Sequence, residues 1–229
     1  MTTPLTRPGL TRRQVAAGAG ALALAPLYAA FQATREAPIS LARPTAAVAE
    51  LAPPRIAPPV FLEDLKQRSF RFFWETTDAR TGLAPDRWPA RSFASIAAVG
   101  FALTAYPIGV ARGWITREQA RDRALATLRF FHDAPQGPEP TGTAGHKGFF
   151  YHFLDMASGT RFGDTELSTI DTALLLAGAL HVQSFFDGAD EQETQIRAIA
   201  DALYARVDWT WAQTSSGLIA RGWQPEKGF

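Results

Sequence analysis

The sequence predicts an all-α fold in which inner and outer helices alternate, as in an α/α toroid. Five helical segments alternate between a one-sided apolar stripe and nearly continuous apolar character. The links from an apolar helix to the next amphipathic one are short, whereas the links in the other direction are long. The pattern also recurs at a spacing of roughly 75 residues, which indicates an internal helical-hairpin repeat.

The amphipathic segments are expected to form the outer layer. In each of them charged residues occupy the face opposite an apolar stripe, which is typical of a helix with one face in water. The second of these segments also carries a capping-box signature, with Thr116 followed three residues later by Gln119. The predicted outer helices are 61–76, 116–132 and 190–208.

Two segments, 95–112 and 168–187, are apolar almost all round and are expected to be the inner helices, buried on every side. Because successive helices run antiparallel, the long segments 77–94, 133–167 and 209 onward should all emerge on one face. Loops of that length in a compact domain are often functional, so this face is the predicted site. Within the middle loop, residues 148–162 are expected to form a small hairpin over the toroid mouth.

The N-terminal 30 residues resemble a twin-arginine export signal. Arg12 and Arg13 precede a weakly apolar, Ala/Gly-rich stretch that is too short to be a transmembrane helix, and small residues follow it. The alternative is a chance arginine pair before an alanine-rich helix. We therefore expect recognition by the twin-arginine (Tat) export machinery, a periplasmic or secreted location and no stable membrane anchor after cleavage.

Residues 31–60 are rich in Pro and Ala and lack a helical period, so they are expected to be a linker before a folded domain at 61–229. Removing residues 1–30 removes three arginines and no acid from 23 basic and 22 acidic residues, which leaves a net charge of about −2. That balance does not indicate a nucleic-acid partner. The chain has no cysteine and no motif for a nucleotide or other cofactor, so disulfides and thiol catalysis are excluded and no cofactor is predicted.

Two carboxylates, Glu166 and Asp171, lie where the second inner helix begins and are the candidate catalytic residues. A glycosidase needs two carboxyl groups about 5–9.5 Å apart, one to protonate the leaving group and one ionised. Asp171 also has a structural interpretation, because Ser168 and an acid three residues later form a capping box. The equivalent first inner helix begins Ser95-Ile-Ala-Ala98 without an acid, which favours function for Asp171. Glu166 has the alternative of being a solvated loop acid.

Other polar and aromatic residues of the long loops are candidates for binding a saccharide, since aromatic faces stack on sugars and planar polar groups bind hydroxyls. For the aromatic residues, ordinary loop packing is the alternative. His146 and His152 lie six residues apart without a third histidine nearby, so no metal site is predicted. The candidates are Asp86, Arg87, Trp88, His146, Tyr151, His152 and Trp223.

Several long stretches resemble the bacterial glycoamylase-like domain family. They are SIAAVGFALTAYPIGVARGWITREQARDRALATLRFF, GHKGFFYHFLDMASGTRFGDTELSTIDTALLLAGAL and VDWTW, and the resemblance covers roughly residues 65–229. The family includes endo-β-1,2-glucanases and the transglycosylating region of cyclic β-1,2-glucan synthases. The resemblance implies an (α/α)6 toroid with acids in a central cleft. It carries Glu166 and Asp171 over as acids of the ELSTIDTALL motif, and Asp86 and Arg87 from TGLAPDR.

Such a toroid has twelve helices, whereas the sequence predicts five, so this chain is expected to be a truncated member, and whether the fragment is active or inactive stays open at this point. The predicted function is that of an exported glycoside hydrolase acting on a β-glucan of the β-1,2 type by carboxylate chemistry, with an oligo- or polysaccharide as its partner. A glucan transglycosylase, a non-catalytic carbohydrate-binding module and an incomplete helical scaffold that needs a partner chain are the alternatives.

Overall fold

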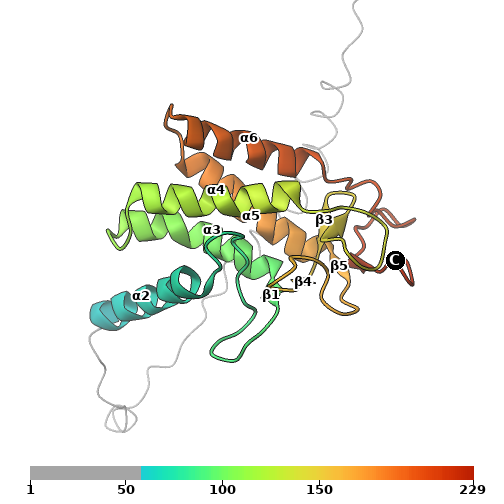
Figure 1. Cartoon of the computed structure of the whole chain (residues 1–229), viewed down its shortest axis with the longest axis horizontal. Helices are drawn as coiled ribbons and strands as arrows, with labels where there is room; N and C mark the ends of the chain where they lie inside the picture. The colour runs from blue at the N-terminus through green and yellow to red at the C-terminus, as the bar shows by residue number, and fades with distance from the viewer. Residues whose placement is uncertain (1–57) are drawn as a thin grey trace, which may run out of the picture. The chain divides into compact units, whose positions relative to one another are not determined.

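The computed structural model describes residues 58–229, which are coloured in Figure 1. The predicted export signal with Arg12 and Arg13, and most of the predicted linker, lie outside the described residues. Within residues 58–229, no helix combines the length and the apolar character that crossing a bilayer requires.

The five predicted helices are confirmed, and their ends are set by local signals. Ser95 and Asp190 cap α3 and α6 with their side chains, and Thr116 forms the predicted capping box with Gln119 at the start of α4. The first helix begins at Pro58, three residues before its predicted start. The helices are α2 (Pro58–Thr76), α3 (Ile96–Ala111), α4 (Arg117–Asp133), α5 (Thr169–Phe185) and α6 (Glu191–Ala205).

The helices form an inner and an outer layer, as predicted. The inner pair, α3 and α5, shares the most extensive helix contact, and α4 packs beside α6 in the outer layer (Figure 1). The inner pair approaches backbone to backbone at Gly100 and Gly178, because a Cβ built on Gly178 would lie 2.3 Å from the carbonyl oxygen of Gly100. Two glycines therefore set the spacing of the inner layer.

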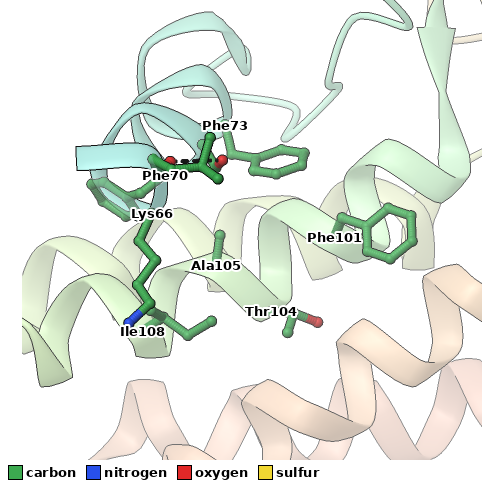
Figure 2. A pocket seen from close by; sticks show the side chains of 9 residues that line it. Lys66, Phe70, Phe73, Phe101, Thr104, Ala105 and Ile108 are labelled. Atoms are coloured by element: carbon green, nitrogen blue, oxygen red, sulfur yellow. Dashed lines mark hydrogen bonds between the residues drawn. The ribbon is translucent and has the colours of Figure 1, made fainter. Parts of the chain in front are cut away.

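The first helix, α2, packs against α3 and leaves an apolar groove of about 430 Å³ between them. Figure 2 shows Phe70 and Phe73 of α2 on one side of this groove and Phe101, Ala105 and Ile108 of α3 on the other. No carboxylate lines it. The groove is therefore a feature of helix packing rather than a site for acid–base chemistry.

The prediction that both inner helices are buried on every side is wrong along one face of each. Phe101 and Ile108 of α3 are 52% and 47% exposed, and Ile170 and Leu174 of α5 are 54% and 37% exposed. The reason is that, among the described residues, only α3, α6 and β3 contact α5 extensively, and that Phe101 and Ile108 of α3 line the open groove beside α2.

Two small antiparallel sheets lie beside the helices, so the described part of the chain is not all-α as predicted. One sheet pairs β1 with β4, and the other has the order β2-β3-β5-β6. They form because the residues just before each inner helix are extended: the capping serines Ser95 and Ser168 have φ near −105° and pair with strands from the middle loop. The strands are β1 (Ala94–Ser95), β2 (Gly145–His146), β3 (Phe149–Tyr151), β4 (Phe153–Leu154), β5 (Leu167–Ser168) and β6 (Gly222–Trp223).

A small hairpin lies within the predicted region 148–162, where Leu154 bridges Arg161 across a turn. The strand before it, β3, occupies the middle of the larger sheet, and Phe149, Phe150 and Tyr151 are fully buried. The register Phe150↔Ser168 and Leu167↔Trp223 brings the middle loop, the start of α5 and the C-terminal segment together. This sheet fixes the loop face around the start of α5.

Candidate active site

Asp171 is held at the start of α5 by the residue that caps the helix. The hydroxyl of Ser168 accepts a hydrogen bond from the backbone N–H of Asp171 (3.1 Å) and donates one to the Asp171 carboxylate. A capping box would also need the Asp171 carboxylate to accept from the backbone N–H of Ser168, and that bond is not formed here, although α4 has it. The sister helix α3 is capped by Ser95 with no acid at all. A serine cap therefore does not require an acid at position 171.

His152 lies between the two candidate acids. Its Nδ1 is 3.0 Å from Oε1 of Glu166, and its Nε2 is 3.7 Å from Oδ2 of Asp171. The backbone N–H of His152 also donates to the carbonyl oxygen of Glu166 (2.9 Å), which ties the two segments together. The three side chains are 30%, 44% and 18% exposed for His152, Glu166 and Asp171, so the cluster opens to solvent mainly at Glu166.

This arrangement limits how far apart the carboxylates can be. Each carboxylate contacts a different nitrogen of the His152 ring. The width of that ring and the two contact distances therefore limit the separation of the carboxylates. Such a separation is compatible with the range of about 5–9.5 Å that glycosidases use for their two carboxyl groups. The three side chains thus bring two carboxylates and an imidazole into one small region.

A cavity of about 720 Å³ lies beside Glu166 and is walled by the C-terminal segment. Its lining combines charged and aromatic side chains, the mixture expected of a site for a polar ligand with apolar faces. Trp223 reaches it through the pairing of β6 with β5, and its ring stacks on His146 with centroids 5.2 Å apart. The lining includes Glu166, Arg221, Trp223, Gln224, Lys227 and Phe229.

Four of the predicted site residues therefore gather in one place: Glu166, Asp171, His152 and Trp223. His146 supports the Trp223 ring and contacts Trp211 edge to face (5.3 Å). Burial lowers the pKa of His146, with the charge of Lys147 as a smaller cause, so its ring is neutral at pH 7. It acts here as an aromatic neighbour of Trp223.

Tyr151 does not fit a direct role in binding, because its side chain is fully buried in β3. The guanidinium of Arg161 covers its ring at 4.8 Å, and burial raises the pKa of its hydroxyl. The sequence showed an aromatic residue in a functional loop, but not that the loop contains a sheet with Tyr151 on its buried side. Tyr151 is a core residue under the site.

Asp86, Arg87 and Trp88 lie in the first long loop, apart from the acids. Arg87 donates from Nε to Asp86 (3.0 Å), so these two side chains satisfy each other. Trp88 is 65% exposed and lines a cleft with Arg71, Phe72 and other residues of α2. The structure does not bring these three residues to the cavity beside Glu166.

Sequence reasoning missed Arg161, which anchors the C-terminal wall of the cavity. Its side chain is 1% exposed and pairs with both carboxylate oxygens of Glu226, at 2.6 and 3.2 Å. It also donates to the carbonyl oxygens of Thr165 (2.7 Å) and Pro140 (3.2 Å). The ion pair joins residues 65 positions apart, and no local pattern signals such a contact. Among residues 58–229, no three acidic or histidine side chains are grouped to hold a metal ion.

The chain matches no protein-family model. It is 28% identical over 176 residues to an exo-β-1,2-glucooligosaccharide sophorohydrolase (non-reducing end) of Parabacteroides distasonis, an alignment that covers 73% of this chain. It superposes with a TM-score of 0.66 on a β-1,2-glucanase structure from Parabacteroides distasonis, at 26% identity over 76% of this chain. The resemblance to glycoamylase-like domains is confirmed.

A third comparison supports the fold alone. A Bacteroides uniformis structure described as a glucoamylase matches with a TM-score of 0.67 and 24% identity over 76% of this chain. The chain spans only part of each relative: 23% of the sophorohydrolase, 25% of the β-1,2-glucanase and 42% of the glucoamylase structure. The five helices of residues 58–229 thus correspond to part of the fold of these longer relatives.

Proposed function

We propose that this glycoamylase-like chain acts on a β-glucan of the β-1,2-linked type, with Glu166 and Asp171 as its working acids. The observation that carries the proposal is the contact of both carboxylates with His152, beside a cavity walled by aromatic and charged side chains. The sophorohydrolase and the β-1,2-glucanase, whose names specify β-1,2-linked glucans, support the linkage.

The two acids have different positions, which suggests different roles. Glu166 lines the cavity, which supports a role for this acid in contact with a glycosidic oxygen. Asp171 does not line it and is held by Ser168 and His152. In the proposed mechanism Glu166 donates a proton to the glycosidic oxygen as its bond to the anomeric carbon breaks, a water molecule adds to that carbon, and the proton that this water loses restores Glu166. Asp171 keeps His152 oriented so that Glu166 remains in place.

The substrate class is tested by offering the purified chain β-glucans of different linkage and measuring both binding and product formation. We expect binding of β-1,2-glucooligosaccharides to be at least about tenfold tighter than that of β-1,3- or β-1,4-linked chains of equal length. Equal affinity for all three, or affinity for none, would contradict the proposal. New oligosaccharides longer than the substrate would identify transfer instead of hydrolysis.

A non-catalytic carbohydrate-binding role is the second candidate, because the chain spans only 23% of the sophorohydrolase and 25% of the β-1,2-glucanase. Binding without any product, unchanged in Glu166→Gln, would favour it. Binding that is retained in Glu166→Gln, together with product that disappears in this variant, would favour the enzyme.

We also propose that the protein is exported by the twin-arginine route, which the pair Arg12 and Arg13 ahead of an apolar stretch supports. Fractionation of cells that express the full chain tests this. We expect the protein in the periplasm or medium, and expect it to be retained inside when both arginines are changed to Lys. Export of that double variant at the normal level would contradict the proposal.

A further inference from the structure

We propose a second saccharide-binding position between residues 87–93 and the hairpin 154–162, in a cavity of about 520 Å³. This inference rests on the proposed function, because it assigns the cavity to the same β-glucan that contacts Glu166. The lining is Arg87, Ala90, Arg91, Ser92, Phe93, Asp155, Met156 and Phe162, and none of these residues lines the cavity beside Glu166.

Both walls of this cavity are held by backbone hydrogen bonds. The first loop is closed at its base, where the N–H of Asp86 donates to the carbonyl oxygen of Phe93 (2.9 Å). The opposite wall is the hairpin, in which Phe162 donates to Phe153 (3.0 Å) and Asp155 donates to Thr160 (2.8 Å). The cavity is therefore preformed by the fold, as ligand sites usually are.

Aromatic rings provide an apolar surface in this cavity. The ring of Phe93 lies against Phe153 at 4.1 Å between centroids and against Phe162 at 4.8 Å. Phe162 is 42% exposed, which is unusual for a large apolar side chain that has aromatic neighbours to pack on. The Phe162 ring, which packs on Phe93 and is exposed to solvent, can receive the C–H face of a sugar.

Three polar groups in the cavity retain unused hydrogen-bonding capacity. The hydroxyl of Ser92 is buried without a partner, which is costly for a polar atom, and within residues 58–229 the Arg91 guanidinium forms no hydrogen bond or ion pair. Asp155 accepts three bonds at Oδ1 from Ala157 and Ser158, and its second oxygen remains available. The N–H bond from Ser158 is the largest cause that lowers the pKa of Asp155, which keeps it a carboxylate.

The charges favour a neutral ligand over an anion. Arg87 is paired with Asp86 at 2.8 Å, and the charge of Arg91 is matched by that of Asp155 in the same lining. A hydroxyl, a guanidinium and a carboxylate next to apolar rings can satisfy the hydroxyl groups of one sugar unit.

A stack of rings connects this position to the acids. Phe153 contacts Phe93 on the cavity side and also stacks on His152, with centroids 3.9 Å apart and planes at 26°. His152 in turn contacts Glu166. A glucan chain long enough to pass this stack would contact Glu166 at one point and the ring of Phe162 at another, so the second position should add affinity for long chains only.

Binding measurements on the full chain with β-1,2-glucooligosaccharides of increasing length test the inference. We expect Phe162→Ala and Arg91→Ala each to weaken the longest ligand by roughly tenfold and to leave the disaccharide unchanged. Tyr204→Ala and Arg68→Ala are matched controls on exposed faces of α6 and α2 and should change neither. The amide NMR signals of residues 92–93 and 162 should shift only with long ligands.

The outcomes separate this inference from the proposed function. Shifts confined to Glu166 and Trp223 at every ligand length would overturn the second position and leave the proposed function standing. Binding to no β-glucan at all would overturn both. Glu166→Gln should retain the shifts at Phe93 and Phe162 with long ligands, and their loss in that variant would contradict an independent second position.

Discussion

The imidazole Nδ1 of His152 lies 3.0 Å from Oε1 of Glu166, and the other ring nitrogen faces Asp171. This contact is possible because the backbone N–H of His152 also donates to the carbonyl oxygen of Glu166. The middle loop and the entry to α5 are therefore bound to each other at the point where the acids lie. The predictions below follow from this junction and from the helices that support it.

Replacing His152 by Ala should impair the site rather than the fold. Without the ring, Glu166 loses its partner and Asp171 loses its link to Glu166, so we expect product formation to fall by about a hundredfold with a small change in ligand affinity. His181→Ala, on an exposed position of α5, is the matched control and should be neutral. If steady-state kinetics showed only a weaker affinity for the ligand, His152 would act in ligand binding rather than in product formation.

Replacing Ser168 by Ala should have two effects, and the sister helix separates them. Both Ser168 and Ser95 cap an inner helix, so each Ala variant should lower the free energy of unfolding by about 1 kcal/mol. Only Ser168 also donates to a carboxylate, that of Asp171. We therefore expect activity to fall in Ser168→Ala alone, as measured by denaturant unfolding and kinetics on the same samples.

The helix positions were predictable because each reflects a local pattern. Apolar periodicity and capping residues placed all five helices within a few residues of their ends. The sheets were not predictable, since their strands are two or three residues long and carry no alternating pattern. Their pairing depends on register between segments far apart, such as Leu167 with Trp223.

The candidate site was partly predictable for a similar reason. Comparing Ser95 with Ser168 in the sequence favoured function over capping for Asp171, and in the structure both serines cap their helices although only α5 has an acid in its first turn. The burial of Tyr151 and the pairing of Arg161 with Glu226 depend on tertiary contacts that spacing does not encode. The exposure of Ile170 and Leu174 on α5 also depends on tertiary contacts, namely on which elements pack against that helix.

The close contact of the inner helices predicts an unusual effect of Gly178→Ala. Alanine normally stabilises a helix relative to glycine, but here its Cβ would approach the Gly100 carbonyl to 2.3 Å, and backbone cannot move aside easily. We expect the free energy of unfolding to fall by about 1–3 kcal/mol. Chemical denaturation measures this, and an increase in stability would show that the two helices do not cross at these glycines.

The ion pair between Arg117 and Glu193 predicts a pH-dependent stability. Arg117 contacts both carboxylate oxygens of the buried Glu193, at 2.7 and 2.8 Å, and these bonds lower the pKa of Glu193 below its ordinary value of 4.5. Because the folded pKa is the lower one, the stabilisation is complete above the unfolded value and is lost as the pH falls through the folded value.

Glu193→Gln should therefore reduce stability at pH 7 and flatten its decline in acid. We expect a loss of about 2 kcal/mol at pH 7, moderated by the partial exposure of Arg117. Glu191→Gln, an exposed acid in the same helical turn, is the control and should retain the normal pH profile. Thermal unfolding between pH 3 and pH 7 compares the two variants. Parallel pH profiles for both would show that this ion pair does not cause the loss of stability in acid.

The measurement that tests the central claim most directly is the rate at which the protein converts β-1,2-glucooligosaccharides, with wild type, Glu166→Gln and the control Glu191→Gln compared at equal folded concentration. We predict that Glu166→Gln lowers the rate by at least about a thousandfold while the ligand still binds, and that Glu191→Gln converts substrate normally. Wild-type turnover in Glu166→Gln would contradict the assignment of Glu166 as a working acid.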